Sequence, residues 1–184
     1  MGYTHYWRQQ RDFTPAEWNE LTRLTKLITA DGSSILANGF SDRGSQPTID
    51  SEEICFNGIG EDGHETFRIT KKKREKADYE KQEPYNRQGE AYDRQGAFEF
   101  CKTAQKPYDK YVVAVLCALF NMKIKLDEEK YPVLYIRSDG NTADWTEGLF
   151  HAVRSTRKEE MYCPIRDCLT LSYVDYIDQE KKTG

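Results

Sequence analysis

The stretch from Tyr108 to Met122 constrains the fold more than any other part of the chain. In a helix, its valine, leucine, alanine and phenylalanine side chains would point to most sides of the helix axis. Such a helix must be buried on most sides. Its β-branched residues would also suit a strand, but its length favours a helix. Proline is well suited to the first turn of a helix, because its missing N–H would be unpaired there. The sequence therefore predicts a helix that starts at Pro107 and packs at the centre of the fold.

A second helix is predicted by its N-terminal sequence. Thr14 is a candidate N-cap, Pro15 follows at the first helical position, and Glu17 completes a capping box. Phe13 and Trp18 have the spacing of a hydrophobic staple across that cap. The apolar face predicted for this helix consists of Trp18, Leu21, Leu24, Thr25 and Ile28.

The remaining elements are shorter. They are strands at 3–7, 53–56, 66–69, 131–136 and 169–177, and a third helix from Asn141 or Thr142 to about Ser155. A glycine-rich connection joins the second and third strands, which indicates a hairpin. Residues 32–50 have the composition of a loop. Together these elements predict an α+β fold, in which a mixed or antiparallel sheet packs with two or three helices.

A chain of 184 residues fits one domain, or one domain with an insertion. It can bury roughly 70% of its surface on folding, so a core is available although only 38% of its residues are hydrophobic. Residues 71–96 are dense in Lys, Glu, Arg and Gln, and carry Tyr-x-Arg-Gln-Gly twice, at 85–89 and 92–96. Two copies are too few for a solenoid. We expect a single domain over 1–184, with a charged, partly flexible insertion at 71–96 that is either a solvated loop or a lid or partner surface.

Charge and cysteine content narrow the possible classes of function. The net charge is −4, whereas a general nucleic-acid binder presents a clustered basic surface. Five cysteines at scattered spacings do not form a disulfide framework. The first residues lack the features of a secretory signal, and the longest apolar run is about half a membrane span. We therefore expect a cytoplasmic protein with no general nucleic-acid binding and no membrane binding, although a local basic pocket is compatible with this composition.

The residues just before the central helix are typical of an anion site. Lys102, Thr103 and Lys106 precede it, and Tyr108 lies at its start. The first turn of a helix directs unpaired N–H groups and a partial positive charge toward whatever precedes it. Phosphate groups bind readily at such positions. Each of these residues could instead have a purely structural role. Thr103, for example, can form a hydrogen bond with nearby backbone.

Three other segments offer chemistry compatible with that site. The first strand carries His5 and Trp7, the hairpin connection carries Asn57 and His64, and Asp139 follows a strand and leads into a helix, where α/β sheets often bind ligands. Rings such as Tyr6, Trp7 or Tyr108 would stack on a base. The residues expected to bind the ligand are His5, Trp7, Asn57, His64, Lys102, Thr103, Lys106, Tyr108 and Asp139.

Motifs for specific reactions are missing from the sequence. It contains no phosphate-binding P-loop, no complete G-x-G-x-x-G and no G-x-S-x-G nucleophile elbow. Cys163 and Cys168 are five residues apart rather than three, so no metal site is predicted, and no cofactor is implied. These motifs therefore assign no catalytic residues.

Several strings resemble a group of hypothetical proteins from bacteria, phages and some fungi. They are Met1–Trp7 (MGYTHYW), Phe56–Gly58 (FNG), His64–Phe67 (HETF) and Phe100–Asp109 (FCKTA-x-KPYD), and Ser138–Gly140 also fits. The resemblance spans most of the chain in this order, and it implies no activity. A phage connection would make sequestration of a signalling nucleotide an analogy to consider.

Three functions follow from these patterns. The first is a small-molecule binder for a nucleotide or other phosphorylated ligand. The second is a hydrolase or transferase acting on such a ligand, with His5, His64, Glu65 or Asp139 transferring protons. The third is a protein-interaction module that uses residues 71–96.

Overall fold

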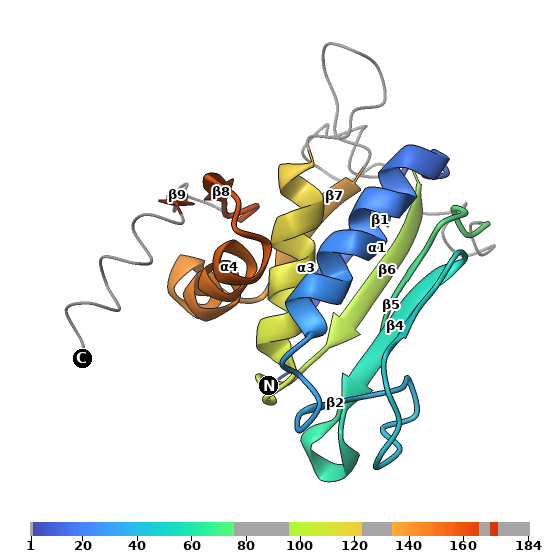
Figure 1. Cartoon of the computed structure of the whole chain (residues 1–184), viewed down its shortest axis with the longest axis vertical. Helices are drawn as coiled ribbons and strands as arrows, with labels where there is room; N and C mark the ends of the chain where they lie inside the picture. Colours follow the sequence, from blue (N-terminus) through green and yellow to red (C-terminus); the bar gives the residue numbers. More distant parts are fainter. Residues whose placement is uncertain (1, 76–95, 123–133, 166–169, 173–184) are drawn as a thin grey trace.

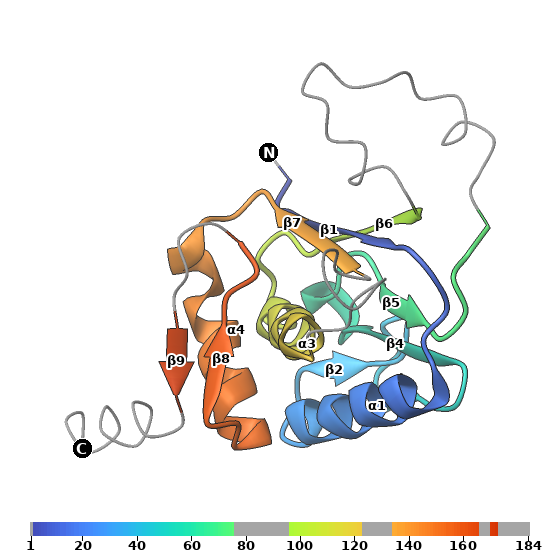
Figure 2. The same cartoon turned by 90° about the horizontal axis from the view of Figure 1, so that it is seen from above.

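Helix α3 (Asp109–Asn121) lies at the centre of the fold, as its apolar sequence predicts. The computed structural model describes residues 2–75, 96–122, 134–165 and 170–172. Helices α1 (Pro15–Thr29) and α4 (Thr142–Thr156), together with the strands, surround α3 (Figures 1 and 2). Every side chain from Tyr111 to Leu119 is buried. The combination of helices with antiparallel sheets confirms the predicted α+β class.

One antiparallel sheet has the strand order β6-β1-β7. Its strands are β1 (Thr4–Gln9), β6 (Ala97–Lys102) and β7 (Leu134–Ser138). In this register His5 lies opposite Cys101 on one side and opposite Ser138 on the other. Figure 2 shows the helices gathered below this sheet. Because successive side chains of a strand point to opposite faces, His5 and Trp7 face the helices, whereas Tyr6 and Arg8 face away.

A second sheet is built around β4 (Glu53–Gly58). This strand pairs antiparallel with β2 (Leu36–Ala37), β3 (Thr48–Ile49) and β5 (Phe67–Thr70). The β4–β5 pair confirms the predicted hairpin, and the turn η1 (Gly60–Asp62) lies in its connection. A separate pair is formed by β8 (Glu160–Tyr162) and β9 (Thr170–Ser172).

The predicted capping box of α1 and the predicted N-terminal cap of α4 are both present. Thr14 caps α1 together with Glu17, and the predicted five-residue face of α1 is its buried face. Asn141 caps α4 and forms a capping box with Asp144. None of the helices in the described ranges is both long and apolar enough to cross a bilayer.

One prediction about the segment before α3 is corrected, and one strand there was not predicted. The helix begins at Asp109 rather than Pro107, because Ala104 and Gln105 have positive φ angles of 51° and 54° and a separate turn closes from Lys106 to Asp109. Strand β6 was not predicted. It is a short strand between the charged segment and the turn, and its alternation of buried and exposed side chains was not recognised in the sequence. Most of the 71–96 insertion and of the 169–177 strand lies outside the described residues.

Candidate functional site

A hydrogen-bonded network of side chains connects β1, β7 and the start of α3. The His5 side chain is fully buried, its Nε2 lies 2.8 Å from Asp109 Oδ1, and its Nδ1 lies 3.0 Å from Ser138 Oγ. The Thr103 hydroxyl also donates to Asp109 Oδ1. With Asp109 ionised, these partners assign the His5 proton to Nε2 and let Nδ1 accept from the Ser138 hydroxyl. Each ring nitrogen of His5 thus has a hydrogen-bond partner.

The surrounding fold holds this network in place. The strand register places Ser138 beside His5, and the first turn of α3 favours a carboxylate at Asp109 through the helix dipole. The rings of Tyr3 and Trp145 approach the imidazole edge-on, with centroids 5.1 and 5.2 Å away. Burial and the nearby Asp109 carboxylate raise the pKa of Tyr3. The imidazole is therefore fixed by packing as well as by hydrogen bonds.

Beside Asp109 lies a cavity of about 390 Å³, which we call the α3 pocket. Its polar lining residues are Gln105, Lys106, Asp109, Lys110, Asp144 and Glu147. Small-molecule sites commonly measure about 300–1,000 Å³. A Cβ on Gly148 would lie 2.4 Å from Val113 Cγ1, so this glycine lets α4 approach α3 closely. The pocket is thus formed where α4 meets the first turn of α3.

The α3 pocket offers both positive and negative groups. The Lys106 ammonium donates to the Glu61 carbonyl at 2.9 Å, and an ammonium has two further N–H donors. Lys110 Nζ lies 4.0 Å from Glu147 Oε1. The Asp109 side chain is 14% exposed, and within the described residues no hydrogen bond reaches its Oδ2. A ligand with an anionic part and hydroxyl or amino groups would complement this lining.

The structure brings only some of the predicted ligand-binding residues to this pocket. Lys106 lines it, and His5 and Thr103 lie behind it, bonded to Asp109. Lys102 follows the buried Cys101 in β6 and therefore faces away from the helices. Its backbone N–H donates to Glu65 Oε2 at 2.7 Å.

The predicted stacking rings Trp7 and Tyr108 are both buried. The Tyr108 hydroxyl donates to the Glu65 carbonyl at 2.7 Å, and burial raises its pKa. Neither ring lines the α3 pocket. In the structure, both rings belong to the core.

The other predicted residues lie in local turns. Asn57 is buried, and its side chain bonds the backbone N–H and C=O of His64 at 3.0 and 3.1 Å, which closes the hairpin connection. The His64 side chain is exposed. Asp139 is also exposed and accepts from the Tyr6 hydroxyl at 3.2 Å, on the sheet face away from the helices.

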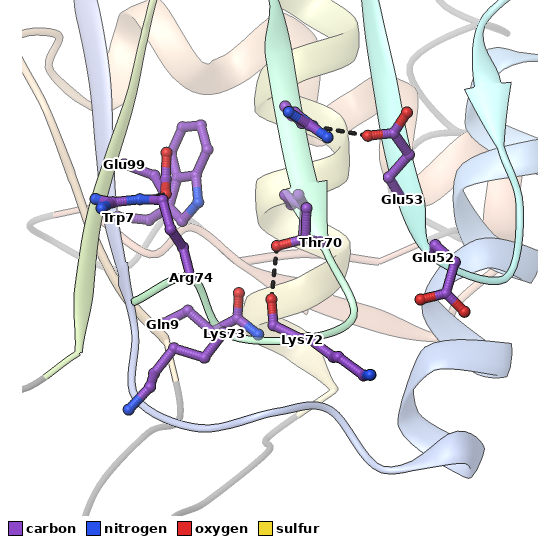
Figure 3. Close-up of a pocket in the computed structure, with 11 residues that line it drawn as sticks. Trp7, Gln9, Glu52, Glu53, Thr70, Lys72, Lys73, Arg74 and Glu99 are labelled. Carbon is purple, nitrogen blue, oxygen red and sulfur yellow. Dashed lines mark hydrogen bonds and ion pairs between the residues drawn. The ribbon is translucent and has the colours of Figure 1, made fainter. Parts of the chain in front are cut away.

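A larger cavity, of about 440 Å³, lies between β1 and β5 (Figure 3). Two ion pairs of 2.7 Å occupy its walls, Arg68 with Glu53 and Arg74 with Glu99. In Figure 3 the Lys72 and Lys73 side chains extend away from Trp7. The guanidinium groups of this cleft are engaged by carboxylates, whereas the α3 pocket presents a carboxylate, Asp109, that His5 and Thr103 hold in place. We therefore regard the α3 pocket as the better candidate.

Sequence reasoning missed Gln105, Lys110, Asp144 and Glu147 as pocket residues. Asp144 is visible in the sequence only as part of a capping box, and Lys110 and Glu147 meet through the packing of two helices. Among the described residues, no three His, Cys, Asp or Glu side chains gather in a way that could hold a metal ion. Comparisons of this chain with protein-family models, with curated proteins and with solved structures found no match.

Proposed function

We propose that this protein binds a small phosphorylated molecule, such as a nucleotide, in the α3 pocket. One observation carries the proposal. The Asp109 carboxylate is held by His5 and Thr103 at the edge of a cavity that also contains Lys106 and Lys110. Side chains that are fixed before the ligand arrives bind with a smaller loss of conformational entropy.

Each end of such a ligand has a partner in the pocket. Lys106 and Lys110 attract the phosphate, and Asp109 Oδ2 accepts from a ribose hydroxyl or a base amino group. Thr103 then acts by orienting Asp109 rather than by touching phosphate. A signalling nucleotide belongs to this class of ligand, and its sequestration would need no catalytic group.

Thermal denaturation with a panel of ligands tests the proposal. The panel comprises nucleoside mono-, di- and triphosphates, cyclic nucleotides, sugar phosphates and inorganic phosphate. A ligand at a hundredfold excess over its Kd stabilises the folded state by about 2.7 kcal/mol. For a chain of this length that raises Tm by roughly 5–10 °C. Unchanged Tm with every member at millimolar concentration would contradict the proposal.

Matched variants then assign the site. Lys106→Ala and Asp109→Asn should each weaken the binding of the active ligand by about tenfold or more, since each removes a charged partner. Lys72→Ala is the control, because it removes a lysine from the other cavity. Equal losses in all three variants would mean that the ligand binds elsewhere.

The hydrogen bonds that link Ser138 to His5 and His5 to Asp109 support a second candidate function. It is a hydrolase or transferase with Asp109 as general base. Ser138 is less suited to be the nucleophile, since its Oγ already accepts from the Gly140 N–H at 3.0 Å. Incubation with the bound ligand, followed by mass spectrometry, separates the two functions. A binder returns its ligand unchanged, whereas an enzyme yields a product that disappears in Asp109→Asn.

A further inference from the structure

The outer face of the β6-β1-β7 sheet, opposite the helices, carries a row of aromatic rings. Tyr6 and Phe98 are stacked, with centroids 6.0 Å apart and planes 19° apart. Phe100 continues the row, 5.9 Å from Phe98. Phe100 is 51% exposed, so its ring is available at the surface beside Phe98. None of the described helices covers this face (Figure 2).

Cations accompany these rings. The strand register places Arg8 beside Phe98, Lys102 beside Thr4, and Arg137 beside Tyr6. The Arg8 guanidinium lies 4.9 Å from the centroid of the Phe98 ring. Asp139, which bonds the Tyr6 hydroxyl, is the carboxylate at the end of this face. A chain with a net charge of −4 therefore concentrates three cations around three rings on one surface.

This combination has a specific chemical complement. Bases that are not paired in a duplex expose π-faces, which stack on aromatic side chains, and their phosphates bind Arg and Lys. A duplex hides those faces within its own stack. The low net charge argues against a general basic footprint, but a strip of stacking rings needs only a few cations beside it.

We propose that the outer face of this sheet binds single-stranded nucleic acid without strong sequence preference. Tyr6 and the exposed Phe100 stack on bases, Phe98 holds Tyr6 and Arg8 in place, and Arg8, Lys102 and Arg137 contact the phosphates. The proposal is independent of the α3 pocket, which is lined by the start of α3 and by α4 and by no residue of this sheet.

Fluorescence anisotropy of labelled oligonucleotides with the full chain tests this proposal. The probes are oligo-U and oligo-dT of about 12 nucleotides, within the site sizes known for sheet-type binders. Both should bind at 50 mM salt, and a preference for oligo-U would indicate contact with the 2′-hydroxyl. Two or three phosphate contacts predict an affinity loss of about 7- to 20-fold between 50 and 200 mM salt.

Variants locate the surface. Phe100→Ser should weaken binding by about 5- to 100-fold, the range expected for loss of one stacked base, and Arg137→Ala should lower both the affinity and the salt dependence. The matched controls are Phe40→Ala, which removes an 87% exposed ring elsewhere, and Arg23→Ala on α1. Both should bind like the wild type. Because Phe100 is exposed, its variant should keep the wild-type Tm.

Three results would overturn the proposal. The first is no anisotropy change at 50 mM salt with protein at 100 µM, a limit about equal to the weak end of non-specific binding. The second is equal binding by Phe100→Ser, Phe40→Ala and the wild type. The third is wild-type self-association that Phe100→Ser abolishes without any oligonucleotide binding, which would make this face a protein contact. Lys106→Ala should leave oligonucleotide binding intact, so failure of the pocket proposal is distinguishable from failure of this one.

Discussion

The two faces of strand β1 differ in how deeply their side chains are buried. On the inner face, His5 and Trp7 are buried, and His5 needs a partner for each ring nitrogen. On the outer face, Tyr6 and Arg8 remain partly exposed and contact Phe98. Neighbouring residues of one strand thus stabilise the core on the inner face and remain accessible to a ligand on the outer face. The comparison teaches that residue type alone does not assign a role, since Trp7 and Tyr6 are both aromatic residues at adjacent positions.

The largest effect is expected for Trp7→Ala. Removal of a buried tryptophan deletes apolar contacts and leaves a cavity, which costs about 3–5 kcal/mol. Tyr6→Ala, one position away, should cost less than about 1 kcal/mol because its ring is only half-buried. Urea denaturation measures both, and equal losses would show that the two faces are equally packed.

A smaller loss is expected for His5→Ala. The substitution removes a donor from Asp109 and a partner from Ser138, and an unsatisfied buried polar group costs about 1–3 kcal/mol. Ligand affinity at the α3 pocket should fall with it, because Asp109 loses its orientation. A stable His5→Ala that binds ligand normally would show that the inner-face network is not needed for the pocket.

Acidification should lower the stability of the folded protein through His151, which lies in α4. This side chain is buried, its Nε2 lies 2.7 Å from the Ile28 carbonyl oxygen, and burial lowers its pKa. The unfolded chain then binds a proton more readily than the folded one, so stability falls as pH falls below about 6.5. Urea midpoints between pH 7.5 and 5 should drop more for the wild type than for His151→Gln, and parallel drops would contradict this assignment.

The smallest change in stability is expected on the outer face. Phe100→Ser should shift the free energy of unfolding by less than about 0.5 kcal/mol, as is usual for exposed positions, while it weakens oligonucleotide binding. A loss of 2 kcal/mol or more, well above the roughly 0.5 kcal/mol usual for a surface site, would show that Phe100 is a packing residue. The difference between the two faces would then disappear at this position.

Local sequence patterns predicted the elements whose causes are local. The capping box at Thr14, the buried face of α1, the N-cap at Asn141 and the β4–β5 hairpin all follow from residues a few positions apart. The burial of α3 also followed from sequence, because a helix that is apolar all round must be enclosed. The start of α3 was displaced by the left-handed turn at Ala104 and Gln105, whose residue types do not indicate positive φ.

The sequence by itself determined which segments are helices, which of their faces are buried, and that one helix is enclosed by the rest. Tertiary structure alone decided that His5 meets Asp109, which is 104 residues away, and Ser138, which is 133 residues away. It also decided that Trp7 faces the core whereas Phe100 faces outward, because the register of three distant strands sets those faces. The physical reason is that capping and periodicity act within a few residues, whereas a pocket exists only after strands and helices far apart in the chain have packed together.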